Sequence, residues 1–330
     1  MSKPKGHHFY PRLCLQHFAG TEPGGQVWTY DAISGKVWSA IPEETAVETH
    51  FYSAEQPDGT MDTRVEDFLS DVESRAAPVY EGLLSGIVPG AAQARTDFAQ
   101  FLAVMYARTP TMRRMSAEIH GRGLQIHSYA YASDDEAFER LTRQVENEKG
   151  EPMDPQIKEE IRKRLLDPSG FELVVPKELT LSALTISDRL VPLFYKMKWS
   201  LLSAGHGFFI TSDNPVVREV DPRSRHPIYG DHGFLNRSAE VTFPLSPKLI
   251  LLLSWDQDAP DQAELKRQHV ELMNNARAAC SERYLYAHLR HSSLEKLAAK
   301  FKHSRPMMTT EGFGPKRFAP IKVSRRSKKE

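Results

Sequence analysis

Cysteine is nearly absent from this sequence: Cys14 and Cys280 are the two cysteines among 330 residues. They lie far apart and form neither a paired metal-binding motif nor a disulfide framework of the kind that small secreted domains carry. We therefore expect two reduced thiols. A chain of this length buries enough apolar surface to fold without a disulfide or a structural metal.

Long apolar runs and an excess of charge of either sign are also missing. The longest apolar run, 249–253, is far too short to span a bilayer, and residues 1–20 contain no apolar core of a secretory signal. We therefore expect a cytoplasmic protein without a membrane partner. The 43 basic and 43 acidic residues cancel, which argues against binding nucleic acid through bulk positive charge and leaves room only for a local basic groove.

Phosphate-binding motifs are missing too. No Gly-rich loop follows a strand, and neither a Walker motif nor the protein-kinase motifs occur. What is present is a change of periodicity along the chain. Aromatic and β-branched residues around a turn predict a hairpin over 27–38. Helical spacing of apolar residues dominates 62–202, β-type segments return at 207–217 and 241–255, and a last helix is expected over 261–289.

This order predicts an α+β fold that is predominantly helical, with an N-terminal β-hairpin and a C-terminal mixed or antiparallel sheet in a single compact unit. The elements do not alternate as they do in a doubly wound nucleotide-binding fold. We predict one globular domain over 1–315 with a charged helical insertion at about 133–170, followed by a basic, disordered tail over 316–330. Pro78 is expected to kink or end the first long helix.

A polar segment at the end of a buried-looking strand is the first candidate for a catalytic site. Asp213 could act as a general base for water and Asn214 could donate hydrogen bonds to a substrate, because a sheet fixes groups at its strand ends. Pro215 would hold Asn214 in an extended conformation. The alternative is an ordinary Asx turn, which the same residue types favour.

Two acidic residues and a histidine give a second group of candidates. Glu66 and Glu73 lie seven residues apart, which places them on one face of a helix, where they could act in general acid–base catalysis or bind magnesium. His8 could act as an acid or join a metal site. The alternatives are a solvated acidic helix face and surface histidines.

Arginines and aromatic residues give a third group. Arg108 ends an apolar helix, where it could interact with the helix dipole or bind a phosphate. Together with Arg113 and Arg12 it could form a surface that follows a phosphate backbone. Tyr52 belongs to an aromatic-rich stretch that could stack on a base, although packing of a hairpin on the core explains the same residues.

Seven segments, taken in order, carry a resemblance to a known family: HHFYPRLCLQHF, VWTYDAISGK, the stretch from FYS to DGTMDTRVEDFLSDVESRAAPV, FLAVMYARTP, FITSDNPV, VTFPLSPKLILL, and the last helix with NN and ERYLYA. Over 7–288 the chain resembles a bacterial family of domains of unknown function, number 4238 of that series. The resemblance implies a part in antiphage defence and the activity of a DNA glycosylase that excises hypermodified bases from phage DNA. The charged region at 133–169 lies outside these segments.

The implied reaction suggests a role for each candidate. Breaking an N-glycosidic bond builds positive charge on the sugar. Asp213 would stabilise that charge, Asn214 would help to position water, and His8 would assist the departing base. Tyr52 could stack on a base extruded from the duplex, and Arg108 with its neighbouring arginines could hold the flanking phosphates. This reaction requires no metal and no other cofactor, and its partner is modified phage DNA.

Two other functions fit the same residues. A metal-dependent nuclease or phosphoesterase would use as ligands His8, Glu66, Glu73 and Asp213. A non-enzymatic nucleic-acid-binding module of a defence system would use the basic and aromatic surface without chemistry, and its binding would depend on salt. Removal of metal with EDTA separates the nuclease from the glycosylase.

Overall fold

The structure is a computed structural model that describes residues 6–20, 24–49, 54–55, 61–90, 92–167, 173–224, 233–302, 304 and 321–323. The sequence predicts one globular domain with an insertion, and the internal contacts divide the chain into two compact units. The first unit comprises Met1–Met112 and Ala183–Pro306, and the second comprises Arg113–Ser182 and Met307–Glu330. The predicted insertion at 133–170 lies within the second unit.

The larger sheet of the first unit is five-stranded and mixed, with the strand order β10-β11-β12-β8-β13. Neighbouring strands in this sheet are antiparallel, except that β13 runs parallel to β8 at one edge. The strands are β8 (Lys198–Ala204), β10 (Val217–Glu219), β11 (Glu240–Ser246), β12 (Leu249–Ser254) and β13 (Gln262–Leu265). The predicted C-terminal mixed sheet is thereby confirmed, and so is the α+β class.

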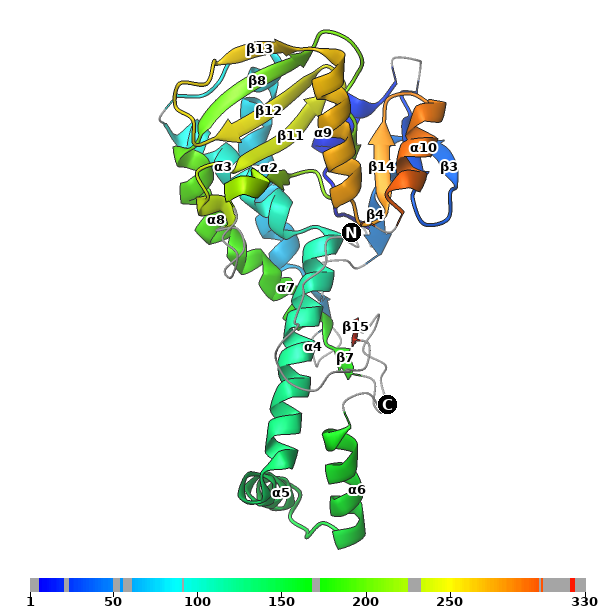
Figure 1. Cartoon of the computed structure of the whole chain (residues 1–330), viewed down its shortest axis with the longest axis vertical. Helices are drawn as coiled ribbons and strands as arrows, with labels where there is room; N and C mark the ends of the chain where they lie inside the picture. The colour runs from blue at the N-terminus through cyan, green and yellow to red at the C-terminus, as the bar shows by residue number, and fades with distance from the viewer. Residues whose placement is uncertain are drawn as a thin grey trace. The chain divides into compact units, whose positions relative to one another are not determined.

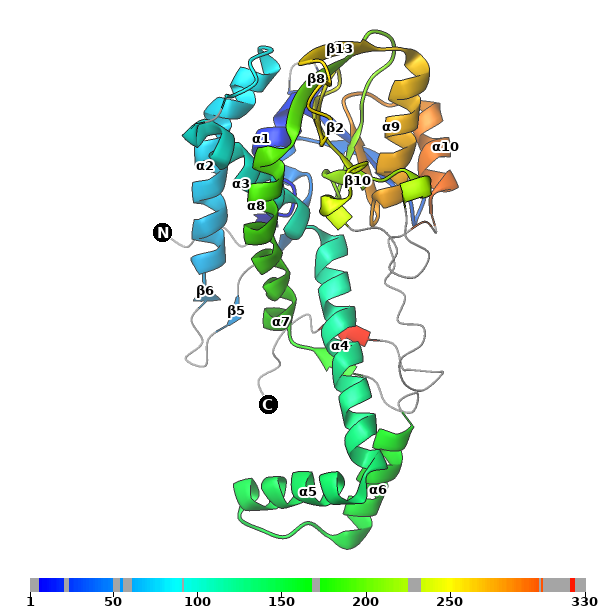
Figure 2. The same cartoon turned by 60° about the vertical axis from the view of Figure 1, so that its left-hand side comes forward.

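Helices cover both faces of this sheet (Figures 1 and 2). They are α2 (Arg64–Leu84), α3 (Gln93–Ala107), α8 (Ile186–Lys196) and α9 (Arg267–Cys280). Successive side chains of a strand point to opposite faces of the sheet. On one face, Trp199 and Phe243 form ring contacts with Phe98 and Phe101 of α3. On the other face, Leu202 packs with α9. A strand buried on both faces must be apolar at successive positions, as β8 and β12 are.

The smaller sheet has the strand order β3-β2-β14-β9. Its strands are β2 (Val27–Asp31), β3 (Val37–Ala40), β9 (Thr211–Ser212) and β14 (Tyr284–Ala287), and α10 (Ser292–Lys300) packs on it. The predicted hairpin over 27–38 is confirmed as β2 and β3. Gly35 in its turn has a φ of 73°, a conformation that glycine adopts without strain.

The remaining elements are short or belong to the second unit. In the first unit they are α1 (Arg12–Leu15), β1 (Gly6–His8), β4 (Val47–Thr49), β5 (Ala54–Glu55) and β6 (Met61–Asp62). The second unit contains α5 (Asp135–Lys149), α6 (Pro155–Leu166), β7 (Leu173–Val175), α7 (Lys177–Leu181), β15 (Ile321–Val323) and all of α4 (Pro110–Ser133) beyond Met112. The helical structure expected at about 133–170 is present as α5 and α6, and Gly150 ends the first of these helices with a φ of 74°. Within the tail predicted over 316–330, β15 pairs with β7, and the other residues lie outside the described ranges.

Three predicted boundaries were wrong. The helix expected to reach residue 202 ends at Lys196, and 198–202 belong to β8, because a run that is apolar on both sides fits a buried strand as well as a helix. The last helix expected over 261–289 is three elements, β13, α9 and β14. Pro78 lies inside α2, which continues to Leu84, so the helix does not end there as one of the two expected outcomes had it. In the described residues, no helix is both long enough and apolar enough to cross a membrane.

The packing of the larger sheet gives a direct test of the fold. Leu251 on β12 is fully buried on the face that α2 and α3 cover, so Leu251→Ala should lower the free energy of unfolding by about 2–5 kcal/mol. Leu235, which is 65% exposed, provides the matched control, and Leu235→Ala should change it by less than about 0.5 kcal/mol. Urea unfolding of both variants measures the difference; equal values would contradict the placement of β12 in the core.

Candidate functional site

A cleft with a volume of about 800 Å³ lies in the first unit, between α9 and the β10 edge of the larger sheet. Leu272 and Met273 of α9 and Phe301 beyond α10 give it an apolar wall. Its charged and titratable lining residues are Glu219, Asp221, Arg237, Glu240, Asp256 and His269. The cleft therefore combines an apolar surface with a concentration of carboxyl groups.

Glu219 and Glu240 form a carboxylate pair in this cleft. They are direct partners in the antiparallel register of β10 and β11, so their side chains leave the sheet on the same face and are near neighbours. Both residues are exposed at the lining of the cleft. The partial burial of their side chains raises the pKa of both carboxyl groups, and the charge of Glu240 raises the pKa of Glu219 further. Like charges opposite each other are destabilising, so sharing one proton relieves the repulsion between them.

Asp221 and Arg237, two further charged residues of the cleft, each interact with a neighbouring side chain. Hydrogen bonds from Arg223 lower the pKa of Asp221 to about 2, so this carboxyl group is ionised at neutral pH. The guanidinium of Arg237 lies 5.2 Å from the centre of the Trp255 ring, which holds one cation at the side of the cleft. A carboxylate pair with raised pKa values beside a fixed cation is an arrangement that general acid–base catalysis uses.

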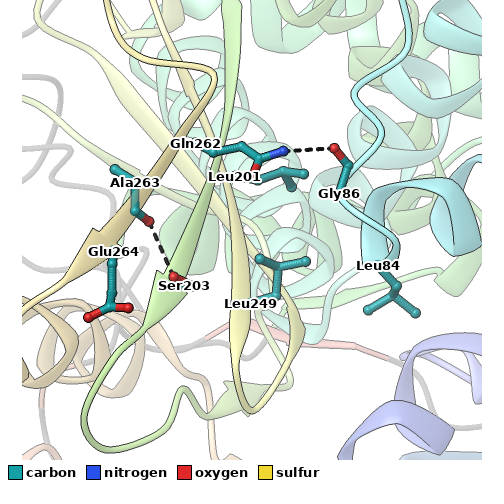
Figure 3. Close-up of a pocket in the computed structure, with 8 residues that line it drawn as sticks. All are labelled: Leu84, Gly86, Leu201, Ser203, Leu249, Gln262, Ala263 and Glu264. Carbon is teal, nitrogen blue, oxygen red and sulfur yellow. Dashed lines mark hydrogen bonds between the residues drawn. The ribbon is translucent and has the colours of Figure 1, made fainter.

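A second cleft, of about 320 Å³, lies between the end of α2 and strands β8 and β13 (Figure 3). Gln262 crosses it, and its Nε2 donates to the carbonyl oxygen of Gly86 at 2.9 Å. Among the described residues that line this cleft, Glu264 alone carries an ionisable side chain. It therefore offers no acid–base pair.

Asp213, predicted as a general base, is buried and accepts hydrogen bonds from backbone N–H groups. Its Oδ1 accepts a hydrogen bond from the N–H of Glu282 at 2.9 Å, and its Oδ2 accepts from the N–H groups of Arg283 and Tyr284 at 2.7 and 2.8 Å. Burial raises the pKa of Asp213 to about 7, although these three donors lower it. The carboxyl group thus fixes the first residues of β14.

Asn214 also forms a hydrogen bond to the backbone. Its Nδ2 donates to the carbonyl oxygen of Cys280 at 2.9 Å, which joins the segment after β9 to the end of α9. Its Oδ1 is buried and has no hydrogen-bond partner among the described residues. Asp213 and Asn214 together fasten the start of β10 to the turn between α9 and β14.

Three of the predicted residues come together at the N-terminal strand. Arg108 is buried, and its Nη1 lies 2.7 Å from Oε1 of Glu73, while its Nε donates to the carbonyl oxygen of Phe9 at 3.2 Å. His8 hydrogen-bonds through Nδ1 to the carbonyl oxygen of Thr45 at 3.1 Å. Burial lowers the pKa of His8; the hydrogen bond to Thr45 and the charge of Glu73 act against this effect, and the charge of Arg108 adds to it. The sequence contains all three residues, but only the fold shows that they are neighbours.

The other predicted contact residues are dispersed. Arg12 forms an exposed ion pair with Glu43, at 2.9 Å between Nε and Oε1. Glu66 lies in the first turn of α2, Arg113 lies on α4 in the second unit, and Tyr52 lies outside the described residues. Within the described ranges, no three His, Cys, Asp or Glu side chains are close enough to hold a metal ion, and the four ligands considered from the sequence form no such group.

Comparison with known proteins identifies the family. Residues 6–291 match the family described as "Protein of unknown function (DUF4238)". The chain belongs to this family. No curated protein and no solved structure matches this DUF4238 member. The resemblance seen in the sequence over 7–288 is thereby confirmed, and the family description carries no activity.

Sequence reasoning missed Glu219 and Glu240. Residues 218–238 are polar and lie between the two β-type segments that the sequence predicts, so the strand that ends at Glu219 was not predicted. The one available signal is that each glutamate adjoins a β-type segment, one after 207–217 and the other before 241–255. That signal does not give the register, and the register is what places the two carboxyl groups opposite each other.

The buried carboxyl group of Asp213 predicts a pH effect on stability. Its pKa rises from 3.8 to about 7 in the folded protein, so between these values the folded state binds the proton more tightly than the unfolded state. The contribution of Asp213 to the free energy of unfolding therefore falls as pH rises from about 4 to about 7. Asp213→Asn should remove this pH dependence and lower stability by about 1–3 kcal/mol, because an amide nitrogen replaces one acceptor oxygen.

Urea unfolding at pH 5 and pH 8 measures this effect. Asp258→Asn, at an exposed position, provides the matched control and should behave as the unaltered protein does. An Asp213→Asn variant with unchanged stability and an unchanged pH slope would contradict the structural role of this carboxyl group.

Proposed function

We propose that this protein is a hydrolase that cleaves N-glycosidic bonds, acting as a DNA glycosylase on hypermodified bases of phage DNA in antiphage defence. The observation that supports the reaction class is the carboxylate pair of Glu219 and Glu240, which lines the cleft from paired strand positions. The family resemblance supports the choice of modified DNA as the substrate.

The chemistry needs one carboxyl group with a proton and one without. As the bond between C1′ and the base nitrogen breaks, its electron pair goes to the base, and the protonated carboxyl group gives its proton to the leaving base. The ionised carboxylate stabilises the positive charge on the sugar and takes a proton from the attacking water, whose oxygen bonds to C1′. The pair has then exchanged protonation states, and solvent restores them.

The lining of the cleft suits a nucleoside unit. Leu272, Met273 and Phe301 offer an apolar surface to a sugar or a base, and Arg237 offers one cation to a flanking phosphate. The excess of carboxyl groups would repel a continuous phosphate backbone, so the substrate enters as a single nucleotide extruded from the duplex or from a single strand. Proteins that act on one base of DNA generally bind it in this way.

This proposal assigns the catalytic roles to residues other than Asp213, Asn214 and His8. Asp213 and Asn214 fasten the strand that carries Glu219, and Arg108 with Glu73 fixes the N-terminal segment by a buried ion pair. The earlier assignment of Asp213 as the base remains a separate prediction. It is tested beside the pair.

The test is to incubate purified protein, with excess EDTA, with DNA that carries phage-type modified cytosines, and to measure released base and alkali-labile sites. Glu219→Gln and Glu240→Gln should each reduce the rate of base release by about 10²–10⁴-fold, the size of a general acid–base contribution. Glu264→Gln makes the same substitution at the opposite edge of the same sheet. It should leave the rate unchanged.

Other outcomes would overturn the proposal in distinct ways. Base release that survives both glutamine variants but is lost in Asp213→Asn would return the chemistry to the segment after β9. Strand cleavage that requires magnesium would indicate a nuclease. Salt-dependent binding of DNA with no product in any condition would indicate a binding module.

A further inference from the structure

A third cleft, with a volume of about 490 Å³, lies in the first unit between α9, α10 and the segment that joins β8 to β9. Its floor is apolar and is formed by Phe208, Val270, Leu294 and Leu297. Val270 and Leu294 are buried, and they belong to two different apolar clusters of the unit. The cleft therefore lies where the two cores meet, and its volume is typical of a site for a small molecule.

Side chains hold the wall of this cleft in place. Asn274 on α9 donates from Nδ2 to the carbonyl oxygen of Phe208 at 2.8 Å, and its Oδ1 accepts from the N–H of Ile210 at 3.0 Å. Lys248, just before β12, donates from Nζ to the carbonyl oxygen of Gly207 at 2.8 Å. A wall that is fixed in advance lowers the cost of ordering that a ligand must overcome.

The rim of the cleft carries more positive than negative charge. Arg267 lines it, Lys248 bonds the wall as described, and Lys300 donates from Nζ to Oδ1 of the lining residue Asn275 at 3.2 Å. Among the described residues that line the cleft, Glu271 is the one carboxylate, and its Oε1 lies 2.8 Å from Nε of Arg267. That ion pair is exposed and uses Nε, so the Nη groups of Arg267 offer N–H donors to an anion.

His291 adds a hydrogen-bond donor at the same rim. The N–H of Ser293 donates to Nδ1 of His291 at 3.2 Å, and Oγ of Ser293 lies 2.7 Å from the same nitrogen. A ring nitrogen that accepts a hydrogen bond from an N–H carries no proton, so the proton of the neutral imidazole is on Nε2. His291 therefore donates from Nε2, and His206 brings a second imidazole to the rim.

The third cleft and the cleft of the carboxylate pair differ in the charge that they accept. Four carboxyl groups line the latter, those of Glu219, Asp221, Glu240 and Asp256. A ligand of the third cleft needs an apolar body for the floor and an anionic group with several acceptor oxygens for the rim. A nucleotide combines both, because its base is a flat ring system that packs on apolar surface and its phosphate accepts charge-assisted hydrogen bonds.

We propose that the third cleft binds a nucleotide unit, with the base against the apolar floor and the phosphate at Arg267 and His291. This inference goes beyond the proposed function and does not depend on it, because it needs neither the carboxylate pair nor base release. Two sources share this chemistry. One is a free nucleoside monophosphate, and the other is the neighbour of the extruded nucleotide in a DNA strand, since Asn275 lines both clefts.

The test is isothermal titration calorimetry of the full chain with deoxyadenosine 5′-monophosphate, compared with deoxyadenosine and with inorganic phosphate. Deoxyadenosine lacks the anionic group and inorganic phosphate lacks the apolar body, so each should bind at least about 10-fold more weakly. Side-chain NMR of the histidines then locates the site. The signals of His206 and His291, assigned from His206→Gln and His291→Gln, should shift with the nucleotide, and those of His120 and His127 on α4 should not.

Substitutions of the exposed ion pair test the sign of the charge. Arg267→Gln should weaken nucleotide binding by about 10-fold, because it removes charge-assisted donors and leaves the charge of Glu271 uncompensated. Glu271→Gln should strengthen binding by about two- to fivefold, because it removes the one carboxylate of the rim. Arg64→Gln, which removes an exposed arginine paired with Asp62 in the same unit, is the matched control and should leave the affinity unchanged.

A short strand of four deoxyadenosine nucleotides separates the two sources. If it displaces the monophosphate and binds more tightly, the site belongs to a DNA strand; if it does not displace the monophosphate, the site is for a free nucleotide. Both results support a nucleotide site. No binding of the monophosphate at millimolar concentration, equal affinity for deoxyadenosine, or equal effects of Arg267→Gln and Glu271→Gln would overturn the inference.

The outcomes for this site and for the proposed function are distinguishable. Nucleotide binding at the third cleft without any base release would overturn the glycosylase proposal and leave this inference intact. Base release by a protein that binds no nucleotide at this cleft would do the reverse.

Discussion

The carboxyl group of Asp213 is the contact on which the arrangement of the first unit depends. By accepting three backbone N–H groups at 282–284, it fixes the turn between α9 and β14 to the segment that leaves β9. That segment continues into β10, so one side chain aligns the smaller sheet, the end of α9 and the edge strand of the larger sheet. Asn214 adds a second link, to the carbonyl oxygen of Cys280.

Glu219 and Arg277 are both connected to this junction. Glu219 ends the short strand that Asp213 and Asn214 hold at its start, and Arg277 lies three residues before Cys280, the residue that Asn214 bonds. Arg277 also donates to the carbonyl oxygen of Pro215, so a second side chain joins α9 to the segment that leads into β10. Paired carboxylates and a buried cation each reduce stability, and proteins tolerate such features where surrounding structure over-determines them.

The parts of the fold that the sequence predicted are those with a local cause. The hairpin β2–β3 follows from its turn residues, and α2 and α3 follow from apolar residues at helical spacing. The wrong boundaries lie where tertiary burial decides, as at 198–202, where successive apolar residues form a central strand. The carboxylate pair depends on the register of β10 against β11, which is set by long-range packing, and no local pattern encodes it.

The same physics explains why the polar segment around Asp213 and Asn214 has the sequence pattern of a catalytic site. Polar residues directly after a buried strand indicate either a catalytic role or a structural role. In a structural role, the hydrogen-bonding groups of the side chain are already occupied by other groups of the protein. Both oxygens of Asp213 are engaged by backbone donors inside the core, whereas Glu219 and Glu240 line a cleft from paired positions on adjacent strands. A group that is to exchange protons with a substrate must be reachable and must gain from changing its charge. The carboxylate pair meets both conditions, because a proton taken up by one member removes the repulsion that the other experiences.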